Sequence, residues 1–217
     1  IETVAGRTYT FRCEEQSQAP RVAGFFDFYG FEGTEYDDGG VKYYIVKPRT
    51  AAKGNPWVWR ARFWGHEPQT DRAMLERGFH VCYCEVGDLF GSEKAISRWD
   101  RFYTFARRQG LAKKACLEGM SRGGLIVYNW TVRNTDKVAA IYADAPVMDL
   151  KSWPLKCDGY GSRNVQYMMK AYGFTTEEDI RRWTMNPIDH ARTMAKSRIP
   201  ILHIVGDKDT GVPVAEN

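Results

Sequence analysis

Residues 115–125 read ACLEGMSRGGL, and this stretch decides the fold. Ala115–Met120 is a short apolar run typical of a buried strand, and the residues after Gly123 have the pattern of a helix. Ser121 falls at the junction, with Gly119 two residues before it and Gly123 two residues after it. Small residues at these two places let a strand and a helix meet closely around an exposed serine. The pattern therefore predicts a nucleophile at Ser121, the alternative being a structural turn serine.

Strands and helices alternate along most of the chain. This alternation predicts right-handed crossovers and a mostly parallel sheet with helices on both faces, in one domain spanning residues 1–217. The first forty residues are rich in Gly, Tyr, Phe and acids and are expected to form irregular strands or hairpins. The predicted strands are Val41–Lys47, Trp57–Trp64, Phe79–Val86, Ala115–Met120, Val138–Val147 and Ile199–Val205, and the helices between them are Gln69–Arg77, Glu93–Gln109 and Gly123–Asn134.

The alternation lapses between residues 149 and 197. Helical patterns near Asn164–Ala171, Glu177–Thr184 and Ile188–Lys196 precede the last strand. An insertion at this point typically covers a pocket at the carboxyl ends of the strands. We therefore predict a cap-like insertion over residues 149–197, the alternative being a plain crossover with extra helices.

The acid that orients a catalytic histidine should follow a late strand. The segment after Val205 reads GDKDTGVP, which favours Asp209 as that acid. Asp207 in the same turn and Asp144 at the end of an earlier strand remain the alternatives.

The histidine itself is harder to assign, because all four histidines precede Asp209. His80 and His203 lie inside predicted strands, His190 on a helix of the insertion, and His66 on a loop. We expect the catalytic histidine after residue 217, so that the hydrolase domain within residues 1–217 is incomplete at its C-terminus.

Acyl transfer to a serine needs two backbone N–H groups that face the developing oxyanion. The residue after the nucleophile, Arg122, is predicted to supply one. His66, or else Trp64, is predicted to supply the other from the loop after the Trp57–Trp64 strand. The Arg122 guanidinium could also bind a carboxylate or polarise an ester carbonyl, the alternative being a surface salt bridge.

Several side chains are expected to line the substrate pocket. Trp153 falls on a loop near the predicted site, as do Glu67 and Asp88, and Asp144 ends a strand there. Aromatic rings combined with carboxylates suit sugar rings, which have apolar faces and polar edges. Core packing is the alternative role for the tryptophans.

Composition narrows the class of partner. The 31 basic and 27 acidic residues are interspersed and give a net charge of +4, which argues against nucleic acid. No stretch has the length of apolar residues that a membrane span needs, so we expect a soluble protein, with a periplasmic or secreted location left open. The five cysteines lack the spacing of a metal site, and no metal or cofactor is expected. Cys13 and Cys157 could pair.

Residues 57–68, 117–125, 142–147 and 206–217 resemble those of a bacterial α/β-hydrolase family. Its members are often labelled sialate or other carbohydrate esterases, or prolyl-oligopeptidase-like hydrolases. The resemblance covers nearly the whole chain from Val41 on and implies the α/β-hydrolase fold. The pair Ser121-Arg122 is also similar to that of glucuronoyl esterases, in which the arginine assists the oxyanion. In such families the histidine follows the acid by several tens of residues.

These observations predict a serine hydrolase that cleaves an ester, with an acylated (acetylated) carbohydrate as the expected substrate. Ser121 would attack the carbonyl and Asp209 would orient the histidine. The alternatives are a peptidase or general acyl-hydrolase, and a glycan-binding module that keeps the fold without the histidine.

Overall fold

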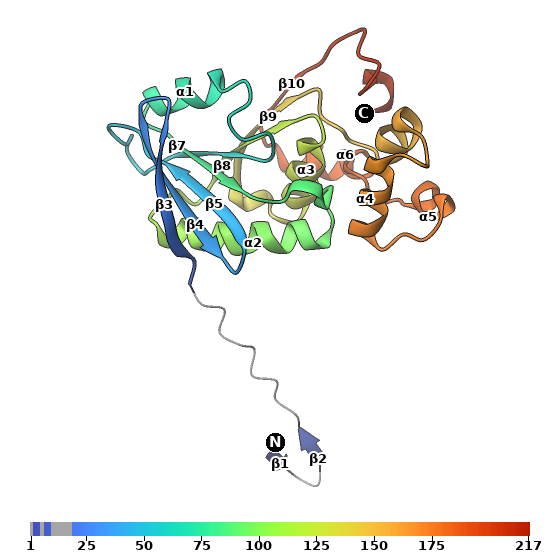
Figure 1. Cartoon of the computed structure of the whole chain (residues 1–217), viewed down its shortest axis with the longest axis horizontal. Helices are drawn as coiled ribbons and strands as arrows, with labels where there is room; N and C mark the ends of the chain where they lie inside the picture. The colour runs from blue at the N-terminus through green and yellow to red at the C-terminus, as the bar shows by residue number, and fades with distance from the viewer. Residues whose placement is uncertain (1, 5–6, 10–18) are drawn as a thin grey trace.

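The computed structural model describes residues 2–4, 7–9 and 19–217 and is organised around one eight-stranded sheet (Figure 1). The strand order is β10-β9-β8-β6-β7-β5-β4-β3. Strands β6 to β10 pair in parallel, whereas β3, β4, β5 and β7 form successive antiparallel pairs. The strands of this sheet are β3 (Arg21–Phe28), β4 (Phe31–Asp38), β5 (Val41–Val46), β6 (Trp57–Arg60), β7 (His80–Cys84), β8 (Ala115–Met120), β9 (Val138–Asp144) and β10 (Ile201–Ile204). A separate hairpin pairs β1 (Glu2–Val4) with β2 (Arg7–Tyr9).

Two tight turns explain the antiparallel half. The β3–β4 turn holds Tyr29 at φ 52° and Gly30 at φ 84°, and the β4–β5 turn holds Gly39 at φ 61° and Gly40 at φ 87°. Positive φ at both central residues is the conformation that joins twisted antiparallel strands with a two-residue loop. Residues 21–46 therefore form an antiparallel meander that extends the parallel sheet.

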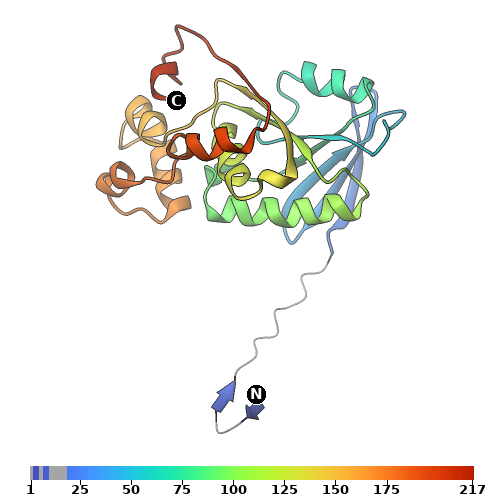
Figure 2. The same ribbon diagram turned by 180° about the vertical axis from the view of Figure 1, so that it is seen from behind.

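Helices cover both faces of the sheet. Helix α1 lies on one face and α2 on the opposite face, and both views agree on this (Figures 1 and 2). The helices are α1 (Gln69–Glu76), α2 (Glu93–Arg108), α3 (Gly123–Arg133), α4 (Arg163–Tyr172), α5 (Glu177–Arg182) and α6 (Ala191–Ser197). The mostly parallel α/β-hydrolase architecture expected from the sequence is confirmed.

Strand β6 is buried on both faces, as a central parallel strand should be. On one face Trp57 and Trp59 join the main core, where Trp59 stacks on Trp99 of α2 with ring centroids 3.9 Å apart. On the other face Val58 packs with Leu75 of α1. The tryptophans of β6 and α2 are thus core residues.

The predicted strand Trp57–Trp64 was too long, because β6 ends at Arg60. The next residue, Ala61, still donates its N–H to the Glu118 carbonyl (2.9 Å), and the chain then leaves the sheet. The departing loop is held by the side chain of Arg60, which alternation of apolar residues does not reveal. The other predicted strands and helices agree with the structure to within a few residues at their ends.

Residues 149–197 lie between β9 and β10 and contain a π-helical turn, Lys151–Lys156, and helices α4 to α6. Val165, Met168 and Ile180 of this insertion form a second hydrophobic cluster with Phe90 and with Leu125 of α3. The insertion is thus packed on the end of the sheet where α3 begins. Across the described residues, no helix has both the length and the apolar character of a membrane span.

The cysteines behave mostly as small apolar residues. Cys82 and Cys84 are fully buried free thiols in β7, and Cys116 is partly buried. Cys157 is exposed. Its predicted pairing with Cys13 lies outside the described residues.

Candidate active site

Ser121 occupies a strained turn between β8 and α3, which we call the elbow (residues 119–123). Its φ is 50°, a left-handed conformation that costs a serine about 1–3 kcal/mol and that persists only where the surroundings enforce it. The enforcing contacts are three backbone hydrogen bonds, one of which runs from the Gly124 N–H to the Ser121 carbonyl (2.9 Å). The Ser121 N–H donates to the Asp144 carbonyl at the end of β9, and the Ser121 carbonyl accepts from the Val147 N–H, both at 2.9 Å. This geometry presents the serine at the carboxyl end of the parallel sheet, as the sequence pattern predicted.

The glycines around Ser121 are required by close packing. A Cβ on Gly119 would lie 2.9 Å from a methyl of Val127, and one on Gly124 would lie 2.6 Å from the Cβ of Pro146. Helix α3 can approach β8 and the loop after β9 only because these side chains are absent.

We therefore expect Gly124→Ala to lower the free energy of unfolding by about 1–3 kcal/mol, because the new methyl overpacks against backbone and ring atoms. Urea denaturation measures this. Gly161→Ala is the matched control, since its Cβ would meet nothing within 4 Å, and its effect should stay within about 0.5 kcal/mol. Equal effects of the two substitutions would contradict the packing argument.

Two backbone N–H groups near Ser121 have no acceptor among the described residues. One belongs to Arg122, at the start of α3, and the other to Arg62, on the loop after β6. The two segments are in contact, because a Cβ on Gly123 would lie 3.3 Å from the Arg62 Cβ and 3.8 Å from its backbone nitrogen. The N–H of His66, by contrast, is already donated to the Phe63 carbonyl (3.0 Å), which leaves it no proton for an oxyanion.

A buried arginine holds the loop after β6. Arg60 is 1% exposed, and its Nε donates to the carbonyls of Arg62 and Phe63, both at 3.1 Å. Its Nη2 donates to the His66 carbonyl, and its Nη1 contacts Asp71 of α1 at 2.5 Å. One buried side chain thus donates hydrogen bonds to three carbonyls of the loop and fixes its path. The sequence analysis missed Arg60, and the only available signal was a charged residue inside an otherwise apolar strand.

The same Nη1 lies 3.2 Å from Glu118, which is 5% exposed and immediately precedes Gly119. Arg60 supplies one positive charge to two buried carboxyls, so one of them keeps a proton. Burial, together with the neighbouring Asp71 carboxylate, raises the pKa of Glu118 to about 8. Glu118 is therefore the protonated member at neutral pH.

This protonation makes stability fall as the pH rises. The native state keeps a proton that the unfolded chain releases near the ordinary pKa of 4.5, so unfolding releases a proton between about pH 4.5 and pH 8. The free energy of unfolding should decrease across that window. Urea titrations at several pH values should show a shallower decrease for Glu118→Gln, which is neutral at every pH. Parallel curves would contradict this assignment.

Two guanidinium groups meet beside the elbow. The Asp88 carboxylate lies 3.3 Å from Arg122 and 3.7 Å from Arg62. Both arginines also lie over the ring of Phe63, and Arg122 over that of Phe90, with 5.3–5.8 Å between guanidinium carbon and ring centroid. Burial and the nearby Arg62 charge lower the pKa of Arg122. The Arg122 side chain is therefore part of this cluster and is only 18% exposed.

Two of the predicted lining residues share one cavity. Glu67 and Asp144 line a space of about 400 Å³ together with Glu118, Gly119 and Met120, the residue before the serine. Trp153 lies elsewhere, stacked on Phe90 with centroids 5.9 Å apart. Asp88 and Trp153 are therefore linked to the elbow through Arg122 and Phe90.

Trp64 points away from the elbow. Its ring packs on Phe28 (4.8 Å between centroids), Tyr44 (5.2 Å) and Tyr83 (5.5 Å), on the face of the sheet that carries α1. Its side chain is thus a packing residue.

Asp209 lies in the turn after β10 and shapes that turn. Its Oδ1 accepts from the N–H groups of Gly211 (2.8 Å) and Val212 (2.9 Å). Its other carboxylate oxygen has no described partner. Asp207 lies in the same exposed segment.

Among the described residues, no histidine hydrogen-bonds to Ser121 or Asp209. The His203 ring of β10 is hydrogen-bonded to the Tyr128 hydroxyl, and His80 of β7 is partly buried in the sheet. His190 lines a different cavity. The described part of the chain also holds no cluster of three His, Cys, Asp or Glu side chains arranged for a metal.

Comparison with known structures supports the fold. The chain is similar to Est1E from Butyrivibrio proteoclasticus, with 18% identity, a TM-score of 0.55, and coverage of 89% of this chain and 81% of that one. It is also similar to FphF, a fluorophosphonate-binding serine hydrolase of Staphylococcus aureus (14% identity, TM-score 0.59, 80% and 77% coverage). A puromycin hydrolase gives 18% identity and a TM-score of 0.61, with 91% of this chain but only 32% of that chain covered.

No protein of characterised function matches the sequence significantly. The sequence profile of the prolyl oligopeptidase family, however, matches residues 103–217, more than half of the chain. The matched region begins in α2 and includes the elbow, the insertion and the Asp209 turn. The chain therefore belongs to the prolyl oligopeptidase family of serine hydrolases.

Proposed function

We propose that this protein hydrolyses carboxylic esters through an acyl-enzyme on Ser121, and that its substrates are acylated, above all acetylated, carbohydrates. The observation that carries the hydrolase proposal is the strained φ of 50° at Ser121, on a strand-to-helix turn beside two unpaired backbone N–H groups. Strain of this kind is retained at functional sites, where it fixes a reacting atom in place.

The residues around Ser121 have distinct roles in this mechanism. The Ser121 Oγ attacks the ester carbonyl, and the oxyanion that forms accepts hydrogen bonds from the N–H groups of Arg122 and Arg62. We assign this role to Arg62 in place of His66, whose N–H is already donated to Phe63, and in place of Trp64, because the Arg62 backbone contacts Gly123 beside the serine. The half-buried Arg122 guanidinium stabilises the same negative charge.

The proton of Ser121 passes to a histidine that Asp209 orients. None of the four histidines among the described residues hydrogen-bonds to Asp209 or Ser121, so none of them is given this role. Asp209 suits the orienting role, since one of its oxygens fixes the turn and the other remains open to a partner.

The carbohydrate part of the proposal rests on the side chains near the elbow. Trp153 is partly exposed and stacks on the buried Phe90, and Arg122 and Asp88 offer a charged donor and acceptor near this pair. A sugar ring can stack on the free part of Trp153 while its hydroxyls bond to the polar groups.

Peptide hydrolysis is the second candidate, favoured by the match to the prolyl oligopeptidase family. A glycan-binding module without turnover is the third. The three differ in what the full-length protein does to matched substrates, so one panel separates them.

The panel compares acetylated xylo-oligosaccharides, 4-nitrophenyl acetate and a prolyl peptide 4-nitroanilide, with Ser121→Ala as the blank. We expect acetate release from the first two, with a higher kcat/KM for the oligosaccharide. Faster cleavage of the anilide would favour the peptidase. Binding of the oligosaccharide without acetate release would favour the module.

A further inference from the structure

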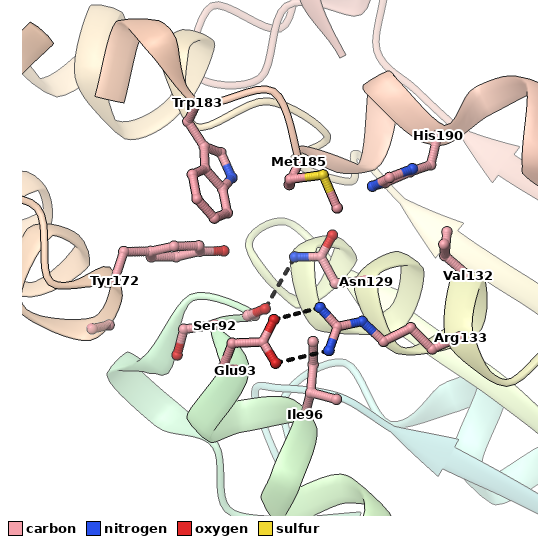
Figure 3. Close-up of a pocket in the computed structure, with 12 residues that line it drawn as sticks. Ser92, Glu93, Ile96, Asn129, Val132, Arg133, Tyr172, Trp183, Met185 and His190 are labelled. Atoms are coloured by element: carbon pink, nitrogen blue, oxygen red, sulfur yellow. Dashed lines mark hydrogen bonds and ion pairs between the residues drawn. The ribbon is translucent and has the colours of Figure 1, made fainter. Parts of the chain in front are cut away.

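A second cavity, of about 260 Å³, lies between the insertion and the body of the domain (Figure 3). Helix α2 contributes Ile96 and α3 contributes Asn129, while Tyr172, Trp183 and Met185 come from the insertion. Ser121 is not among the lining residues. Asn129 follows Gly123, the first residue of α3, by six residues, which places it about 9 Å along the helix axis from the end that carries Ser121. This cavity is therefore separate from the elbow.

Three of the residues that line this cavity each carry a buried polar side-chain atom with no hydrogen-bond partner among the described residues. These atoms are the Ser92 hydroxyl, the Asn129 Oδ1 and the Trp183 Nε1. Ser92 is only 3% exposed and precedes α2 without capping it. Buried polar groups are normally hydrogen-bonded, so three unpaired polar atoms around one cavity indicate a ligand that enters the cavity and bonds to them.

Two of the three atoms have a fixed hydrogen-bonding character. The Asn129 amide nitrogen donates to the Gly91 carbonyl (3.0 Å), which identifies the free Oδ1 as an acceptor. The Trp183 indole N–H can only donate, whereas the Ser92 hydroxyl can do either. A ligand that pairs with all three groups must therefore both donate and accept hydrogen bonds.

The other lining residues favour a ligand with a neutral aromatic ring. The rings of Tyr172 and Trp183 contact each other edge to face, with 77° between their planes, and Ile96, Val132 and Met185 complete an apolar wall. The Tyr172 hydroxyl donates to the Phe90 carbonyl (2.8 Å), which fixes its ring.

The charged groups at this cavity cancel. The Arg133 guanidinium forms two hydrogen bonds to the two carboxylate oxygens of Glu93, as the dashed lines in Figure 3 show. Neither charge is left to bind an ion. An apolar cavity of about 150 Å³ accommodates benzene, so 260 Å³ holds a ring with one polar substituent.

We propose that this cavity is a binding site for a compact neutral aromatic amide. Its carbonyl accepts from Trp183 Nε1 and the Ser92 hydroxyl, its amide N–H donates to Asn129 Oδ1, and its ring packs against Tyr172, Trp183 and Met185. Figure 3 shows Trp183 and Met185 on one side of the cavity and Ser92 and Asn129 on the other, so that a single molecule can reach both sides.

The test uses fluorine NMR of 4-fluorobenzamide with the full-length protein, and fluorobenzene and 4-fluorobenzoate as comparison ligands. We expect the amide to bind at least about tenfold tighter than either, because only it is neutral and carries both a donor and an acceptor. Equal binding of fluorobenzene would overturn the proposal, since the orphan atoms would then contribute nothing.

Three variants locate the binding. Trp183→Phe keeps a ring and removes the donor, and Ser92→Ala removes the hydroxyl; each should weaken amide binding about five- to tenfold. Ser97→Ala, at an exposed serine of α2, is the matched control and should bind as the wild type does. If the first two variants also bind as the wild type does, the cavity is not the site. A crystal structure with 4-fluorobenzamide in which only water contacts Ser92 and Asn129 would overturn it equally.

Ser121→Ala separates this inference from the proposed hydrolase. It should abolish turnover and leave amide binding unchanged, because the cavity does not include Ser121. Loss of amide binding in Ser121→Ala would show that the two sites are one and would contradict the proposal, whatever the catalytic result.

Discussion

Ser121→Ala should lower kcat for ester hydrolysis by about 10⁴- to 10⁶-fold while leaving the fold intact. Alanine retains the Cβ and removes only the attacking oxygen, so the backbone bonds to Asp144 and Val147 stay in place. Steady-state kinetics on 4-nitrophenyl acetate measures the loss, and thermal unfolding verifies the fold.

Ser97→Ala serves as the control, because this exposed serine of α2 lies far from the elbow in sequence and lines none of the cavities described above. Its kcat should equal that of the wild type. A folded Ser121→Ala protein that keeps more than about a hundredth of the activity would exclude Ser121 as the nucleophile.

Arg60→Met should lower the free energy of unfolding by about 3–5 kcal/mol, because it leaves the buried Asp71 carboxylate without its cation. It also removes the donors to the carbonyls of Arg62, Phe63 and His66. The loop after β6 then lacks the hydrogen bonds that fix its conformation. Urea denaturation measures the first effect. Arg182→Met, which breaks an exposed pair with Glu178, should change stability by no more than about 0.5 kcal/mol.

Arg60→Lys distinguishes the hydrogen bonds that hold the loop from the positive charge beside Asp71. Lysine keeps a cation near Asp71 but cannot donate to three carbonyls at once. The loop should then hold the Arg62 N–H less well, and kcat should fall on the order of 10²-fold, the typical loss for one oxyanion donor, with little change in KM. An unchanged kcat in Arg60→Lys would show that the loop does not depend on this side chain.

The elbow could be predicted because it depends on local sequence. A short apolar strand, a serine between two glycines and a helix follow one another directly along the chain, and the steric reason for the glycines is local as well. The core positions of α2 could be predicted for the same reason, since their spacing matches one helical face.

The loop after β6 could not be predicted in detail, because its conformation is set by residues far apart in sequence. Arg60 on β6, Asp71 on α1 and Glu118 on β8 meet only after folding. Without them, the predicted strand runs on to Trp64 and His66 looks free to donate, whereas its N–H closes a turn onto Phe63.

The second cavity was likewise invisible in the sequence. Ser92 was correctly placed just before a helix, but a hydroxyl that makes no capping bond is recognised only in three dimensions. The insertion brings Trp183 opposite Asn129, although the two are far apart along the chain. Such pairings follow from packing of the insertion, for which local patterns carry no information.

The most direct measurement of the central claim is peptide mass spectrometry after the full-length protein reacts with a fluorophosphonate. Trypsin cleaves after Lys114 and Arg122, so Ser121 is the only serine in the peptide of residues 115–122. We expect one phosphonate adduct on that peptide in the wild-type protein and none in Ser121→Ala. A folded, full-length protein whose Ser121 peptide stays unmodified would contradict the assignment of Ser121 as the nucleophile.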